Sequence, residues 1–222
     1  MPENSVFYID DVTLPVSWYN VSRRNNRVYV MVQSTQGSQT TTYKGDFSLP
    51  KSNYHIVSLA NGICTLLSAR MAAQGIPNSN TTVLVDTPTN TFTLEPPPNA
   101  KFTLLPDDSI EEFKANGEYT SAPYRSLNEV LGNNVYKPFN TQGSWTSGYV
   151  NFHSIRNIYM RSSNLGTYST MSLRGDRDIV KKIPVSANAN EVIFNTVMVA
   201  QDYLDCSRHT LSRLRFKLED VD

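Results

Sequence analysis

Alternating apolar and polar residues run through most of the chain and predict β-strands. Residues 12–22 and 27–33 are rich in β-branched and aromatic side chains, and a polar Arg-Asn segment separates them, which predicts a hairpin. In the second run, Val28, Val30 and Val32 fall on one face because successive side chains of a strand alternate. That face is apolar, whereas the opposite face is only half apolar.

Similar patterns recur along the rest of the sequence. Further strands are expected at 40–47, 82–86, 91–95, 101–105, 179–185, 191–199 and 211–220, with a long or bent strand within 148–163. The regular spacing of the three short strands between 82 and 105 is typical of a meander. In the last strand, Leu214, Phe216 and Leu218 alternate with charged residues, which predicts one buried and one solvated face.

One segment has the periodicity of a helix instead. From about residue 52 to 74, apolar residues recur at spacings of three and four, which predicts an amphipathic helix. Ser52 is placed to cap its start, and Gly75 is placed to end it. Because Gly62 inside the helix costs up to about 1 kcal/mol relative to alanine, packing must contribute more than helix propensity.

These patterns place the chain in the all-β class, as an antiparallel β-sandwich. About eight to ten strands are expected, with single helical turns at 107–113 and 126–132. The helix of 52–74 is expected to connect strands and to lie with its apolar stripe against a sheet. No internal repeat and no break in composition divides the sequence, so we expect one domain over residues 1–222.

Charge and composition narrow the class of partner. Lysine plus arginine equals aspartate plus glutamate, at 20 each, so no net field favours nucleic acid or an acidic membrane as the main partner. No run approaches the ~18 apolar residues that cross a bilayer, and the first residues lack a secretion signal. We therefore expect no membrane span. Cys64 and Cys206 are predicted to be core residues rather than a disulfide or a metal pair.

Candidate catalytic and metal-binding side chains form no recognisable set. The chain has three histidines, which are His55, His153 and His209. Their spacing matches no zinc site. Asp107-Asp108 with Glu111-Glu112 could bind a cation or act as acid and base, but an acidic first helical turn explains the same residues. Asp10-Asp11 has no partner carboxylate at a recognisable offset, so we expect no catalytic residue, no metal and no cofactor.

Three further features suggest binding. The basic residues of 208–217, together with Arg23, Arg24 and Arg27, could contact nucleic-acid phosphates or form a solvated strand face. Arg174-Gly175-Asp176 matches the tripeptide that integrins recognise on mobile loops. The 133–148 loop contains three aromatic side chains that could form a receptor- or carbohydrate-binding platform, namely Tyr136, Phe139 and Trp145.

Several segments form an ordered set. A Leu-Pro step leads into the helix through Leu49, Pro50, Tyr54, Asn61 and Gly62. Later positions of the set are Ile155, Asn157, Ile158 and Tyr159, then Ile183, Pro184 and Val185, and finally Leu211, Leu214, Phe216, Leu218 and Asp220. Together these segments resemble the penton, or minor capsid, proteins of Polinton-like viruses, adintoviruses and the related Maverick elements.

The resemblance implies a single jelly roll that forms homopentamers at the fivefold vertices of an icosahedral capsid, beside a double-jelly-roll major capsid protein. It implies a place in the virion, after assembly inside the host cell, with packaged DNA and a host receptor as further candidate partners. Relatives continue with another strand beyond the position of Asp222, so a final strand is expected to be missing, cleaved or supplied by a neighbour. A monomeric receptor- or carbohydrate-binding β-sandwich is the open alternative.

Overall fold

The computed structural model describes residues 5–76, 79–115, 126–133, 143–153, 155–165, 178–196, 203–206 and 213–220, without the side chains of 112–115. Contacts between residues divide the chain into two compact units. Unit 1 comprises residues 1–18 and 155–222, and unit 2 comprises residues 19–154. The single domain expected over residues 1–222 stays a prediction.

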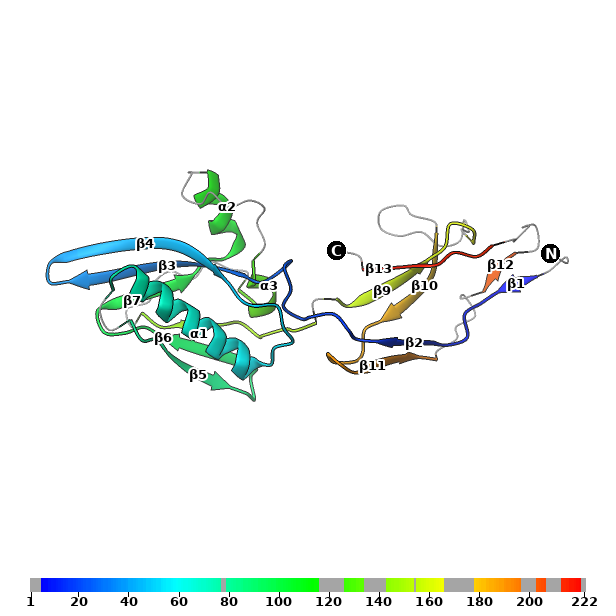
Figure 1. Cartoon of the computed structure of the whole chain (residues 1–222), viewed down its shortest axis with the longest axis horizontal. Coiled ribbons are helices and arrows are strands. Elements are labelled where there is room, and N and C mark those ends of the chain that lie inside the picture. The colour runs from blue at the N-terminus through cyan, green and yellow to red at the C-terminus, as the bar shows by residue number, and fades with distance from the viewer. Residues whose placement is uncertain are drawn as a thin grey trace. The chain divides into compact units, whose positions relative to one another are not determined.

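Unit 1 is built from antiparallel strands (Figure 1). Its strands are β1 (Val6–Phe7), β2 (Val12–Pro15), β9 (Asn157–Arg161), β10 (Ile179–Pro184), β11 (Val192–Asn195), β12 (Leu204–Asp205) and β13 (Lys217–Glu219). They form the pairs β1–β12 and β2–β11 and the three-stranded sheet β10-β9-β13. Each of these ladders is antiparallel.

The main core of unit 1 lies between the β9–β10 pair and the β2–β11 pair. Ile158 and Ile183 from the first pair pack with Val12 and Ile193 from the second, and none of the four is more than 7% exposed. A smaller cluster joins β10 to β12 in the same way. Apolar side chains at alternating positions thus meet between two layers of strands. The predicted all-β antiparallel sandwich is confirmed.

Within its described residues, unit 2 contains two three-stranded sheets. The hairpin of β3 (Arg27–Gln36) and β4 (Gln39–Ser48) is extended by β7 (Ala100–Leu104) into the sheet β4-β3-β7. The second sheet, β5-β6-β8, consists of β5 (Thr82–Asp86), β6 (Thr91–Glu95) and β8 (Trp145–Thr146). Both sheets contribute to one hydrophobic cluster.

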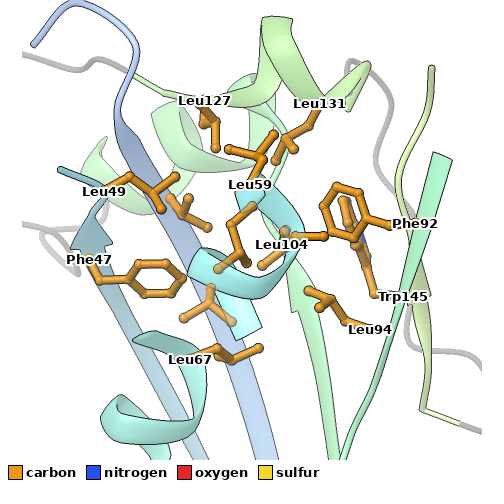
Figure 2. Packing of buried hydrophobic residues seen from close by; sticks show 14 of the residues in the cluster. Phe47, Leu49, Leu59, Leu67, Phe92, Leu94, Leu104, Leu127, Leu131 and Trp145 are labelled. Carbon is orange, nitrogen blue, oxygen red and sulfur yellow. The ribbon is translucent and has the colours of Figure 1, made fainter. Parts of the chain in front are cut away.

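Helix α1 (Ile56–Ala73) contacts β4 of the first sheet and β5 and β6 of the second. Its buried residues recur at spacings of three and four, and they are Ile56, Leu59, Ala60, Ile63, Leu67 and Met71. Figure 2 shows Leu59 and Leu67 with Phe47 of β4 on one side and Leu94 of β6 on the other. The expected amphipathic helix against a sheet is confirmed, and its apolar stripe closes the core of unit 2.

The half-apolar face of β3 is covered too, fully at Tyr29 and in part at Met31. Tyr29 is 1% exposed and packs with Leu105 and with Ile110 of α2 (Asp107–Ala115). A third helix, α3 (Asn128–Leu131), adds two of its side chains to the main core. The two short helical turns predicted in this part of the sequence are therefore confirmed. Their packing explains why β3 can be apolar on both faces.

Two predicted strand pairings are wrong. β2 pairs with β11 rather than with β3, because the chain passes from unit 1 into unit 2 between Trp18 and Tyr19, within the predicted first strand. β7 pairs with β3 rather than with β6, so only β5 and β6 of the predicted meander are neighbours. Alternation identifies a strand and its faces, but the partner is chosen by burial against distant segments.

α1 begins later than expected, and Ser52 does not cap it. Ser52 instead forms a backbone bridge with Val21. The cap is His55, whose Nδ1 accepts a hydrogen bond from the Ser58 amide at 3.4 Å, while Ser58 Oγ accepts from the His55 amide at 3.1 Å. This reciprocal pair satisfies two amide groups that the first helical turn leaves without partners. At the other end, Gly75 has a φ of 72°, as expected for a residue that ends a helix.

By length and composition alone, α1 could cross a membrane, since the mean hydropathy of its 18 residues is 1.4. In unit 2, however, its buried residues belong to the core between the strands. Core helices commonly reach this hydropathy because one face is apolar throughout. The expected lack of a membrane span stays a prediction.

Alanine should be tolerated less well at Gly132 than at Gly37. Both glycines have a positive φ, 59° and 60°, where a Cβ costs about 1–2 kcal/mol. An added Cβ meets nothing within 4 Å at Gly37 but lies 2.8 Å from the carbonyl oxygen of Tyr149 at Gly132. We expect Gly37→Ala to lower the free energy of unfolding by that strain alone, and Gly132→Ala to lower it further. Urea denaturation measures both, and equal losses would contradict the close backbone approach.

Candidate assembly surfaces

The segment that leads into and includes β13 carries three apolar side chains that unit 1 leaves exposed. Leu214, Phe216 and Leu218 are 39%, 43% and 47% exposed. The expectation that this face would be buried is wrong. Of the described residues 213–220, only Lys217–Glu219 form a strand, and that strand, β13, lies at the edge of the described sheet and pairs with β9. Three exposed apolar side chains in and beside an edge strand are typical of a surface that another molecule covers. We call these three residues the apolar strip.

Ion pairs hold the segment that carries the apolar strip against the rest of unit 1. Arg161 of β9 forms ion pairs with Glu219 of β13 at 2.9 Å and with Asp178 at 3.1 Å. Lys217 also pairs with Glu219. On one side, the ring of Phe216 stacks on Phe7 with 6.0 Å between the ring centroids. The strip is therefore held in place while its apolar side chains remain accessible.

Other segments of unit 1 expose apolar side chains too. Tyr8 and Tyr203 meet edge to face, with 5.3 Å between their centroids, and are 46% and 45% exposed. Phe194 of β11 is 69% exposed. Exposed aromatic side chains are enriched at protein interfaces because they bury a large area with few rotatable bonds. Unit 1 thus offers more than one apolar face for association.

Unit 2 has an apolar pocket beside α1. Its volume is about 320 Å³, and its lining residues are Leu49, Pro50, Tyr54, Asn61, Gly62, Thr65 and Leu66. The motif residues from Leu49 to Gly62, which begin with the Leu-Pro step, therefore all line one pocket. Sequence reasoning missed Thr65 and Leu66, although both follow from continuing the helical spacing of Asn61 and Gly62 by one turn.

Hydrogen bonds hold the wall of this pocket in place before any partner binds. The Asn20 side chain donates to the Tyr54 carbonyl at 2.7 Å and accepts from the Tyr54 amide at 2.8 Å. The Tyr54 hydroxyl donates to the Pro50 carbonyl at 2.9 Å. Burial raises the pKa of Tyr54, so this hydroxyl stays protonated and keeps donating. The pocket is preorganised.

Gly62 creates the floor of the pocket. An added Cβ would lie 3.2 Å from Leu49 Cδ2 and 3.8 Å from the Tyr54 ring. A glycine inside a helix costs about 1 kcal/mol relative to alanine. Here the missing side chain allows Leu49 and Tyr54 to pack close to the helix. The glycine in the motif thus has a local packing reason.

The candidate catalytic groups are not brought together. His55 caps α1, His153 is exposed, and His209 lies outside the described residues. Asp10 and Asp11 are exposed. Within the described ranges, no group of three histidine, cysteine, aspartate or glutamate residues is arranged to hold a metal ion.

The predicted carboxylate cluster at 107–112 is part of a structural network. Asp107 Oδ1 accepts hydrogen bonds from Ser126 Oγ at 2.7 Å and from Asn128 Nδ2 at 2.5 Å. Asp108 and Glu111 are exposed, and the side chain of Glu112 lies outside the described residues. Asp107 therefore ties α2 to the start of α3, and the acidic first turn suits the helix dipole.

One of the three residues of the predicted aromatic platform is buried. Trp145 is 3% exposed and packs against Phe92 with 5.8 Å between the ring centroids, inside the core of unit 2. It cannot present its ring to a receptor or a carbohydrate, so that part of the prediction is wrong. Tyr136, Phe139 and the Arg174–Asp176 tripeptide lie outside the described residues.

The predicted basic face is divided between the units. Arg23, Arg24 and Arg27 belong to unit 2, whereas 208–217 belong to unit 1. Arg27 pairs with Asp46 at 3.4 Å. Arg213 and Arg215 are exposed beside the apolar strip. A common nucleic-acid-binding face stays a prediction.

Both cysteines are free thiols, and both should react slowly. Burial raises the pKa of Cys206, and the charge of Asp205 raises it further. Burial likewise raises the pKa of Cys64, whose thiol donates to the Thr81 carbonyl at 3.0 Å. Because only the thiolate reacts, labelling by a disulfide reagent at pH 8 should be slower in the folded than in the urea-unfolded protein.

The same two pKa shifts predict how stability depends on pH. The unfolded thiols ionise first as the pH rises, so the free energy of unfolding should fall as the pH rises through the ordinary thiol range and above it. Replacing both cysteines by alanine should remove that part of the pH dependence. Equal labelling rates in the folded and unfolded protein would contradict the burial of these thiols.

Comparison with known proteins finds a likeness of fold. No protein-family model and no curated protein sequence matches the chain. Its structure is similar to the crystal structure of the mavirus penton protein, with a TM-score of 0.57 and 11% sequence identity, over 99% of this chain and 78% of that one. At this identity the likeness is one of fold, and the chain has a penton-like fold.

Proposed function

We propose that this protein is a structural component of a virus capsid, a penton that associates with copies of itself. The observation that carries the proposal is the apolar strip on a chain with a penton-like fold. Exposed apolar side chains in and beside an edge strand lower the solubility of a protein unless another surface covers them. The function of the protein would then be to form subunit interfaces rather than to catalyse a reaction.

The finer proposal is a homopentamer at the fivefold vertices of an icosahedral capsid. Closed rings use head-to-tail contacts, so each copy needs two different surfaces that complement each other. The apolar strip and the exposed aromatic residues of unit 1 supply apolar surface on several segments. A major capsid protein of the double-jelly-roll type is the proposed neighbour around each vertex, and the virion is the proposed location.

The mass of the purified protein in native solution tests this proposal. We expect a particle of five times the 25.0 kDa mass of one chain in native mass spectrometry and in sedimentation equilibrium. The mass should fall toward that of one chain on dilution, because non-covalent assembly follows mass action. A particle that stays a monomer at high protein concentration would contradict the proposal.

A further inference from the structure

The apolar pocket of unit 2 is the feature that the proposed function leaves unused. Its lining contains no charged side chain, and its wall is fixed by the hydrogen bonds of Asn20 and Tyr54. A volume of about 320 Å³ falls at the small end of the range for binding pockets, which are mostly apolar with a few polar groups. An uncharged, apolar group is the occupant that fits.

Unit 2 presents such a group on another of its faces. Val83 and Val85 of β5 pack against the core, so Leu84 between them points to the opposite face. Leu84 is 59% exposed. Its cross-strand partner is Thr93, whose hydroxyl is bonded to that of Thr146 at 2.9 Å. Leu84 is thus a single apolar side chain on a face of threonines.

The charges around the two sites are complementary. Two residues from Leu84, on the same face of β5, the exposed Asp86 carries a carboxylate. On the neighbouring strand β6, the exposed Glu95 accepts a hydrogen bond from the hydroxyl of Thr82. At the pocket, the exposed Lys51 directly follows the lining residue Pro50. The two carboxylates on the face of Leu84 would then meet the one lysine that follows the lining residue Pro50.

We infer that the pocket of one copy receives Leu84 of the next copy. The inference rests on the proposed self-assembly and names one of its contacts. A side chain on one face and a pocket on another give a heterologous contact, which is the kind that closes a ring. Because pocket and side chain both belong to unit 2, each copy can give one contact and accept another.

Three variants test the contact by native mass. Thr65→Arg places a charge at the rim of the pocket, and Leu84→Asp removes the apolar side chain. Each should weaken association by about a hundredfold, since the contact would bury a full leucine side chain. Ala69→Arg is the matched control, because Ala69 is exposed one turn along the same helix and does not line the pocket. It should assemble like the parent protein.

The double variant Thr65→Arg/Leu84→Asp tests whether the two residues meet. Arginine in the rim of one copy would face aspartate of the next, so the double variant should assemble more tightly than the two separate losses predict. Circular dichroism checks the fold, and Thr65→Lys replaces Thr65→Arg if the latter does not fold.

Each result of these mass measurements either supports or contradicts the inference. If the parent assembles and Thr65→Arg assembles equally well, the inference is wrong while the proposed function stands. If both single variants dissociate but their effects simply add, the pocket and Leu84 do not touch each other, and the inference is again wrong. If the parent protein itself remains a monomer, the proposed function fails and the contact fails with it.

Discussion

Leu59→Ala should lower the free energy of unfolding of unit 2 by about 2–5 kcal/mol, the range for removing a leucine from a close-packed core. Leu59 is fully buried, and it lies at the centre of the cluster in Figure 2. It packs where α1 meets strands of both sheets, so few atoms can move in to fill the cavity. Urea denaturation followed by circular dichroism measures the loss.

Val57→Ala is the matched control for this experiment. Val57 lies on the same helix but is 39% exposed, so truncating it removes little buried area, and alanine has the higher helix propensity. We expect a change of less than about 0.5 kcal/mol, as for most surface substitutions. Equal losses for the two variants would show that α1 is not the core helix of unit 2.

Phe216→Glu combined with Leu218→Glu should prevent self-association, and in the monomer it should remove the stacking of Phe216 on Phe7 without unfolding unit 1. Burial of each side chain in an interface contributes about 1.5–3 kcal/mol, and two carboxylates there would also have to lose their hydration. We expect the dissociation constant to rise by at least about a thousandfold, since each 1.4 kcal/mol is a factor of ten. Analytical ultracentrifugation over a range of protein concentrations measures it.

Two arginines of the same segment provide the control. Arg213→Ala combined with Arg215→Ala changes two exposed charged residues that alternate in sequence with Leu214 and Phe216. This variant should associate like the parent, with only a modest change in salt dependence. If it dissociates and the glutamate variant does not, the charged residues and not the apolar strip form the interface.

Much of the fold follows from local sequence patterns. The alternation in β3 and the spacing of three and four in α1 identify these elements because each has one strongly apolar face. Pairing partners were harder to predict. β2 pairs with β11 across most of the length of the chain, and nothing near 12–15 encodes that distant neighbour. The cap of α1 was missed because histidine rarely takes the place of a serine or threonine cap.

The candidate surfaces were predictable only in part. The motif from Leu49 to Gly62 marked the pocket, but its meaning depends on Asn20, which reaches Tyr54 from a distant part of the sequence. Leu214, Phe216 and Leu218 showed the pattern of a buried face. Sequence alternation reports that a face is apolar, and it cannot tell whether the chain itself or another molecule covers that face.

Electron microscopy of the assembled protein tests the central claim most directly. The claim is that copies of this chain cover the apolar strip. We predict rings with fivefold symmetry in which Leu214, Phe216 and Leu218 lie at the contact between neighbouring subunits. Dispersed monomers, or rings in which this strip faces solvent, would contradict it.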